Sequence, residues 1–189
     1  IRRQRQMCIR DSVYTNYPTA ELFINGKSYG KQSKNNSSLK SRYRLMWMDA
    51  VYEPGEVKVV AYNKDGKAVA EKTVRTAGKP HHIELVSNRN ELTADGKDLA
   101  YVTVKVVDKD GNLCPTDSRL IHFSVKGAGK FRAVANGDPT NLEQFHLPKM
   151  HAFHGMLTAI VQAGEIAGDL VLTAKASGVK TGTVHLQAK

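Results

Sequence analysis

Residues 99–108, LAYVTVKVVD, alternate between two sets of side chains. One set is made of valines and the other is mostly polar or aromatic: Val102, Val104 and Val106 against Tyr101, Thr103, Lys105 and Val107. A period of two residues is that of a β-strand. The DKDGN segment at 108–112 predicts a turn at its end, because Asp, Gly and Asn favour turn backbones. This stretch favours an antiparallel β-structure.

Similar short segments fill the chain on both sides of this strand. AELFI, then Asn25-Gly26, then KSYG predicts a hairpin, since both turn residues tolerate positive φ. A polar loop is expected over 31–41, a strand over 44–52 and a turn over 53–56. No segment has a convincing helical period. The sequence therefore predicts an all-β protein with two tandem immunoglobulin-like antiparallel β-sandwich domains.

The domain boundary is expected in TAGKP at 76–80, where Gly and Pro interrupt the strand pattern. The predicted domains are 13–78, truncated at its N-terminus by a strand or more, and 79–189. The first twelve residues, IRRQRQMCIRDS, resemble translated sequencing-adapter read-through at the ends of metagenomic fragments. We therefore interpret 1–12 as non-native sequence. With no initiator Met and no apolar signal core, the chain is interpreted as a fragment.

The net charge of +10 is unevenly distributed over the 189 residues. Residues 1–12 carry net +3, residues 13–78 net +5, and residues 79–189 only net +2. The longer domain is nearly neutral, so nucleic-acid binding is not expected, and the alternative of a basic arm rests on 1–12. No apolar run approaches the roughly 20 residues of a membrane helix, so no membrane partner is expected.

The sequence contains only weak matches to the residue patterns of catalytic and metal-binding sites. The chain is shorter than the roughly 250 residues of a catalytic (β/α)₈ barrel. Glu53 and Glu56 flank Pro-Gly and are interpreted as turn residues. Outside 1–12 the sole cysteine is Cys114, which we interpret as a small apolar residue. We expect no catalytic residue and no cofactor.

Histidines gather in the last third of the chain. A zinc site would need imidazoles at a recognisable spacing, and His146, His151 and His154 with Glu143 match no such pattern. A loop with exposed histidines is the expected alternative. His81 and His82 open a strand, so they are expected to point to opposite faces and not to chelate as a pair. No metal site is predicted.

Two further segments partly resemble ion- or phosphate-binding loops. Asp108-x-Asp110-Gly111-Asn112 resembles part of a calcium loop but lacks its full ligand pattern, so a hairpin turn is expected. GAGK at 127–130 is followed by Phe131, so the Ser or Thr of a phosphate loop is missing. Ser124 lacks the glycines of a nucleophile elbow.

The candidate glycan contacts are Trp47, Asn136 and Asp138. The single tryptophan offers an aromatic face for sugar stacking, but its apolar strand favours a place in the core. Asn136 and Asp138 lie in an NGDP loop, where polar side chains often close a turn. Both interpretations remain open for each residue.

A family resemblance covers almost all of 13–189. It is carried by VYTNYPTAELFINGKSYGK (13–31), by Trp47 and by YEPGEVKVVAYNKDGKAVAEKTVRTAGKP (52–80). It continues in IELVSNRNELTADGKDLAYVTVKVVDKDGN (83–112), NGDPTNLEQF (136–145) and FHGMLTAIVQAG (153–164). Together these segments resemble the C-terminal region of bacterial glycoside hydrolase family 2 enzymes of the β-galactosidase type.

The resemblance implies non-catalytic accessory domains of a retaining glycosidase. In that family the catalytic glutamates lie on a preceding (β/α)₈ barrel, so the expected partner is that missing barrel, and no catalytic residue is assigned here. The alternatives are a carbohydrate-binding module, with an oligo- or polysaccharide as ligand, and a bacterial adhesin-type repeat. A periplasmic or extracellular location is implied by the resemblance alone.

Overall fold

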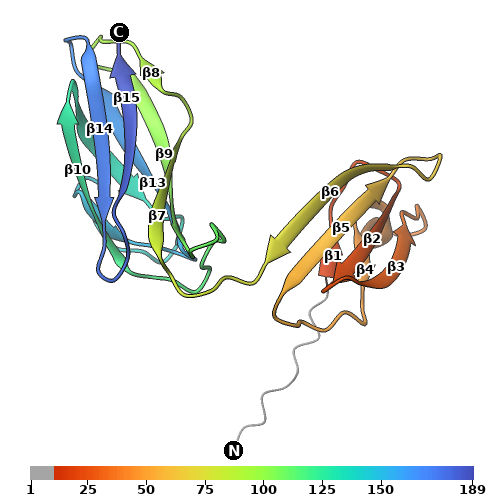
Figure 1. Cartoon of the computed structure of the whole chain (residues 1–189). Coiled ribbons are helices and arrows are strands. Elements are labelled where there is room, and N and C mark those ends of the chain that lie inside the picture. Colours follow the sequence, from red (N-terminus) through yellow and green to blue (C-terminus); the bar gives the residue numbers. More distant parts are fainter. Residues whose placement is uncertain (1–10) are drawn as a thin grey trace, which may run out of the picture. The chain divides into compact units, whose positions relative to one another are not determined.

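The computed structural model describes residues 11–189, which divide into two compact units (Figure 1). The described residues up to Thr76 form the N-terminal unit, and Ala77–Lys189 form the C-terminal unit. The division falls inside the TAGKP segment, and the predicted domain limits remain predictions. Within the described residues, no helix is long and apolar enough to cross a membrane.

The N-terminal unit packs a four-stranded sheet against a two-stranded one. The larger sheet has the order β3-β2-β5-β6, and the smaller pairs β1 with β4. Its elements are β1 (Asp11–Val13), β2 (Thr19–Ile24), β3 (Lys27–Ser33), α1 (Leu39–Tyr43), β4 (Leu45–Trp47), β5 (Glu56–Tyr62) and β6 (Ala68–Arg75). The buried core of this unit is Ala20, Leu22, Ile24, Leu45, Trp47, Ala50 and Ala61.

The predicted Asn-Gly hairpin joins β2 to β3. Asn25 has φ 49° and Gly26 has φ 81°, the positive angles that this turn requires. The Asn25 side chain also reaches a second turn, where its Oδ1 accepts from the Glu56 N–H at 2.7 Å and its Nδ2 donates to the Pro54 carbonyl at 3.2 Å. Asn25 thus forms one turn with its backbone and stabilises a second turn of the same unit with its side chain.

Two expectations for residues 31–52 are wrong. The strand predicted over 44–52 is only β4, because the chain bends at Met48 and Asp49 and buries Ala50 in the core. The polar loop predicted over 31–41 instead contains the end of β3 and the start of α1, whose N-cap Ser38 accepts from the Ser41 N–H. A helix is predicted from the periodic spacing of its apolar residues. The five residues of α1 include no buried side chain, so the sequence does not show this helix.

Residues 11 and 12 take part in β1, within the segment interpreted as non-native. Their Cα partners in β4 are Trp47 and Met46. Backbone pairing of this kind does not depend on side-chain identity. The origin of the segment therefore stays a prediction, and residues 1–10 lie outside the described part.

The C-terminal unit is a sandwich of a five-stranded and a four-stranded sheet, with the orders β12-β10-β14-β15-β8 and β11-β13-β9-β7. Its strands are β7 (His82–Ser87), β8 (Glu91–Leu92), β9 (Leu99–Val107), β10 (Leu120–Gly127), β11 (Gly129–Ala135), β12 (Lys149–His151), β13 (Met156–Ala163), β14 (Gly168–Lys175) and β15 (Gly182–Ala188). The strand pairs are antiparallel except β15 with β8. The all-β sandwich prediction is confirmed.

The strand that first indicated the fold is β9, and its alternation is reproduced through residue 106, whereas Val107, expected on the other face, is also buried. Val102, Val104 and Val106 are fully buried, whereas Tyr101 on the other face is 45% exposed. A buried valine stabilises the fold by about 1.5–3 kcal/mol relative to an exposed one. The same core contains Leu170 and further residues of the opposite sheet.

The GAGK segment forms the tight β10–β11 connection, where backbones approach closely. Ala128 N–H donates to the Asp169 carbonyl at 2.8 Å, which brings β14 against the turn. A Cβ on Gly127, at φ +90°, would lie 1.9 Å from that carbonyl oxygen, and one on Gly129 would lie 2.1 Å from Leu170 Cδ1. The glycines are explained by packing.

This packing predicts that Gly127→Ala destabilises the C-terminal unit more than Gly111→Ala. Gly111 has a similar φ of +83°, but a Cβ added there would meet nothing within 4 Å, so both variants lose about 1–2 kcal/mol to the backbone conformation. Only Gly127→Ala must also move β14, at about 1–3 kcal/mol more. Urea unfolding followed by far-UV circular dichroism measures the difference, and equal midpoints would contradict it.

Candidate functional site

The segment that partly resembles a calcium loop is a hairpin turn centred on a buried carboxylate. Asp108 is 2% exposed. Its Oδ1 accepts from the N–H groups of Asp110 and Asn112, both at 2.9 Å, and its Oδ2 accepts from the Gly78 N–H at 2.7 Å. Asn112 Nδ2 also donates to both oxygens. The carboxylate lone pairs are therefore used by the protein.

These donors change the acidity of the group. The hydrogen bond from the Gly78 N–H, followed by that from Asn112, holds the pKa of the Asp108 carboxyl well below its usual range. Gly78 belongs to the segment that begins the C-terminal unit. Asp108 thus connects the first residues of this unit to the β9 turn.

Trp47 lies in the core of the N-terminal unit. It is 3% exposed, and its indole Nε1 donates to the Gly30 carbonyl at 2.9 Å. A sugar-stacking tryptophan needs one open ring face. The burial therefore favours the core interpretation, while a glycan contact at Trp47 remains an untested prediction.

The NGDP loop is held by its own side chains. Asn136 Nδ2 donates to the His151 carbonyl at 3.0 Å, and Asn136 Oδ1 accepts from the Asp138 N–H at 3.0 Å. Asp138 Oδ1 in turn accepts from the Thr140 N–H and hydroxyl, which lower the pKa of Asp138. This favours the turn-closing interpretation, and glycan contact at Asn136 or Asp138 likewise remains a prediction.

The histidines after this loop have different partners. His151 Nδ1 lies 3.0 Å from Glu143 Oε1, whereas His154 Nδ1 lies 3.3 Å from the Pro115 carbonyl oxygen. His146 is exposed. Among residues 11–189, no three or more His, Cys, Asp or Glu side chains are grouped to hold a metal ion.

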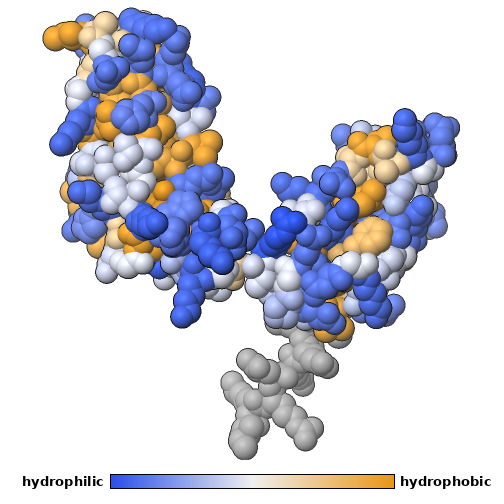
Figure 2. Space-filling model, in the orientation of Figure 1, coloured by the Kyte–Doolittle hydropathy of each residue, from blue (hydrophilic) through white to orange (hydrophobic). Residues whose placement is uncertain are grey.

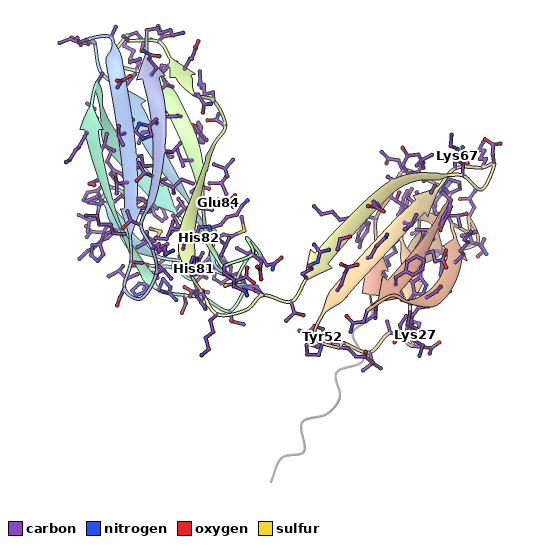
Figure 3. The ribbon with its side chains drawn as sticks, in the orientation of Figure 1. Lys27, Tyr52, Lys67, His81, His82 and Glu84 are labelled. Carbon is purple, nitrogen blue, oxygen red and sulfur yellow. The ribbon has the colours of Figure 1, made fainter. Side chains whose placement is uncertain are left out.

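The expectation that His81 and His82 point to opposite faces is wrong, whereas their predicted failure to chelate as a pair stays a prediction. Their Nδ1 atoms lie 3.1 Å apart and their rings meet edge to face, with centroids 5.3 Å apart (Figure 3). Successive side chains point to opposite faces only within a strand. Because β7 begins at His82, the His81 side chain lies before the strand and can point toward that of His82. The two imidazoles contact each other without a third ligand in the described residues.

Glu53 and Glu56 lie in the second turn that Asn25 contacts. Glu53 Oε2 is 3.5 Å from Asn25 Nδ2, and Glu56 Oε2 forms an ion pair with Arg75 at 2.6 Å. Gly55 between them has φ +139°, and a Cβ there would meet Asn25 Oδ1 at 1.9 Å. The pair forms a turn on the protein surface.

Among the described residues, every carboxyl group with a shifted pKa has a lowered one. The Ser28 hydroxyl lowers the pKa of Glu21, and the Lys97 N–H lowers that of Asp95. At Asp117 burial acts to raise the pKa, but hydrogen bonds from Arg119 outweigh it. Burial raises the pKa of the Cys114 thiol, which keeps it in the less nucleophilic form.

An apolar groove of about 440 Å³ in the N-terminal unit was not expected from the sequence. It is lined by residues 12–15, by Leu22 of β2 and by residues of β5 and β6. The lining residues of β5 and β6 are Val57, Val59, Ala61, Ala70, Glu71, Lys72 and Val74. The one sequence feature that pointed to this surface is the alternation of residues 68–75, which predicts a half-exposed strand. The visible face of each unit carries hydrophobic areas among hydrophilic ones (Figure 2).

Comparisons with known proteins identify the family. The model for the glycoside hydrolase family 2 C-terminal domain 5 matches residues 83–185, and a domain of unknown function, DUF4982, matches residues 12–70. The chain belongs to glycoside hydrolase family 2. The family-2 match therefore covers most of the C-terminal unit.

Family 2 relatives match the chain through both units. The beta-galactosidase BoGH2A of Bacteroides ovatus is 42% identical over 176 residues, 93% of this chain and 20% of that protein. A family 2 structure from Bacteroides cellulosilyticus has a TM-score of 0.83 at 34% identity, covering 94% of this chain and 22% of that one. A beta-glycosidase from Bacteroides vulgatus has a TM-score of 0.85 at 28% identity, with the same coverage. The chain spans about one fifth of the length of these relatives.

The role assigned to Asp108 predicts a pH-dependent stability of the C-terminal unit. The folded pKa lies below the unfolded value of about 3.9, so the carboxylate stabilises the fold above that pH. This contribution is lost as the pH falls through the lowered folded pKa. We expect Asp108→Asn to be less stable at pH 7 and to lose less stability on acidification, measured by urea unfolding. The exposed Asp110→Asn in the same turn is the control, and identical pH profiles of the Asp108 variant and wild type would contradict the assignment.

The burial of Trp47 predicts that Trp47→Ala destabilises the N-terminal unit by about 3–5 kcal/mol. Trp47→Phe keeps most of the apolar volume and loses the Gly30 hydrogen bond, at about 1 kcal/mol. Differential scanning calorimetry measures both, since the fluorescent residue is removed. A Trp47→Ala variant with unchanged melting and reduced binding to a galactoside polymer would instead support the glycan contact.

Proposed function

We propose that this chain is a non-catalytic accessory region of a family 2 glycosidase, in which its β-sandwiches support the catalytic domain. The single observation that carries the proposal is the match of both units to about one fifth of longer family 2 glycosidases. The parent enzyme is proposed to hydrolyse β-glycosidic bonds with retention of configuration. We propose that its substrate is a β-galactoside or a β-glucuronide, because the relatives are named beta-galactosidase and beta-glucuronidase.

The state of the carboxylates supports a non-catalytic role. A retaining glycosidase needs two carboxyl groups about 5–5.5 Å apart, one of them with a raised pKa. Here Glu56 pairs with Arg75 and Glu143 with His151. The shifted carboxyl pKa values are lowered, as expected for groups used in turns and ion pairs.

Carbohydrate binding has less support as a second function. Its best aromatic candidate, Trp47, is buried, and Asn136 and Asp138 use their side chains within the loop. Phe145, which follows that loop, is 55% exposed and is the aromatic side chain best placed there to meet a sugar. A periplasmic or extracellular location of the parent remains a proposal based on family resemblance.

An exchange experiment tests the accessory role. BoGH2A lacking the 176-residue matching region is expected to lose folded protein and β-galactosidase activity, and inserting residues 13–189 of this chain in its place is expected to restore part of both. The purified chain itself is expected to leave nitrophenyl β-galactoside and β-glucuronide unhydrolysed above buffer.

The controls separate the two parts of this proposal. An inserted chain carrying Trp47→Ala should rescue less than the wild-type sequence, because its N-terminal unit is destabilised. Turnover by the purified chain would contradict the non-catalytic role. A truncated BoGH2A that is as active and stable as the whole enzyme would contradict the supporting role.

A further inference from the structure

We propose that one edge of the N-terminal unit binds an acidic polysaccharide, whose negative groups are the carboxylates of uronic acid residues or sulfate esters. This surface, the basic edge, consists of residues 27–44 and is made by β3, the loop that follows it, and α1. The inference rests on the proposed function, because it gives a glycosidase region a glycan ligand. None of the candidate glycan contacts Trp47, Asn136 and Asp138 belongs to this surface.

The first observation is the concentration of one sign of charge. Residues 27–44 contain six Lys and Arg side chains and no Asp or Glu, whereas the rest of 13–78 carries five basic and six acidic side chains. Within the described residues none of the six cations forms an ion pair, in contrast to Arg75 of β6, which pairs with Glu56 of β5. The six cations are Lys27, Lys31, Lys34, Lys40, Arg42 and Arg44.

The second observation is that hydrogen bonds hold these residues together. β3 is the outermost strand of the sheet β3-β2-β5-β6 (Figure 1). After β3, the Asn35 N–H donates to the Ser41 carbonyl at 3.0 Å, and the Ser41 hydroxyl donates to the Asn35 carbonyl at 2.9 Å, which folds the loop onto α1. The Trp47 Nε1 bond to the Gly30 carbonyl then joins the strand after α1 to the middle of β3. The basic edge is therefore one folded surface.

The third observation concerns the partners of a cation on this edge. Lys31 Nζ lies 4.0 Å from the centre of the Tyr62 ring. A cation over an aromatic ring is not neutralised by it, and its N–H groups stay available to negative oxygens. Glu21 lies opposite Lys31 in the strand register, but its two oxygens accept from the Ser28 and Tyr62 hydroxyls. The charge of Lys31 is therefore free to meet an external anion.

The polar groups between the cations suit a sugar. The side chains of Gln32, Asn36 and Ser37 are exposed, and amides and hydroxyls both donate to and accept from sugar hydroxyls. Tyr43 is 60% exposed, and the Arg42 guanidinium lies 5.8 Å from the centre of its ring. An aromatic ring beside a cation can contact a sugar ring and its negative group together, because carboxylates form strong charge-assisted hydrogen bonds with Arg and Lys.

Other polyanions match this surface less well. The DNA major groove takes up an α-helix or a two-stranded ribbon, and the five-residue α1 is too short to follow it. Basic segments also attract anionic membranes. The proposed parent enzyme acts on glycans, and a polysaccharide bound at the basic edge would be held at high local concentration for the same polypeptide. We therefore assign the basic edge to an acidic polysaccharide.

Binding of defined polymers to the full chain of residues 1–189 tests the assignment. The probes are polyglucuronate and a sulfated galactan, each compared with its own neutral form made by carboxyl reduction or by desulfation. Biolayer interferometry measures the affinities. We expect at least one acidic polymer to bind at least about tenfold more tightly than its neutral form, with an affinity that falls as salt is added. The two acidic polymers distinguish carboxylate from sulfate as the group recognised.

Two double variants with reversed charges locate the binding. Lys40→Glu with Arg42→Glu changes α1, whereas Lys64→Glu with Lys67→Glu makes the same change of charge in the turn between β5 and β6. All four side chains are exposed, so both variants should melt close to the wild type. We expect the α1 variant to weaken binding of the acidic polymer at least about tenfold and the turn variant to leave it within about threefold. Residues 1–12 are the same in every protein compared.

Each other outcome overturns the assignment. No binding, equal binding of the acidic and neutral polymers, or an equal loss in both double variants would exclude an acidic polysaccharide from the basic edge. Tighter binding of a short DNA duplex or of phosphatidylserine vesicles than of either acidic polymer would assign the edge to that anion. These measurements use the chain by itself and do not depend on the activity and rescue assays. The accessory role and the basic edge can therefore fail separately.

Discussion

A β-sheet with one apolar face must cover that face, and this constraint governs both units. In the C-terminal unit two sheets of comparable size meet, and Val104 of one and Leu172 of the other are both fully buried. In the N-terminal unit a four-stranded sheet faces a two-stranded one. Leu22 is covered, whereas Val74 at the edge is not. The same physical rule thus explains the complete core and the open groove.

Polar side chains at the turns serve mainly to hold backbone groups. The Asn25 side chain holds the turn at residues 53–56, and Asp108 accepts from three backbone N–H groups around it. Asn136 and Asp138 do the same in a third loop. Residue types that suggest ligand binding in a sequence are therefore used here to close turns. This use agrees with the accessory role proposed for the chain.

Membership of glycoside hydrolase family 2 gives the two units a context that neither provides by itself. Relatives of this family are about five times as long as the chain, since it spans 20–22% of them. Sandwich units within one enzyme usually meet their neighbours through modest interfaces.

Local sequence alone determined the β-strands and most turns. The alternation of residues 99–106 and the Asn25-Gly26 pair each specify a backbone period or angle, and both were predicted correctly. Only the tertiary structure decided which faces are covered, because burial depends on strands distant in sequence. It placed Trp47 in a core, brought His81 against His82, joined Asp108 to Gly78 and left Val74 exposed. The five-residue helix α1 was also missed, since Ser38 caps a turn too short to show a period.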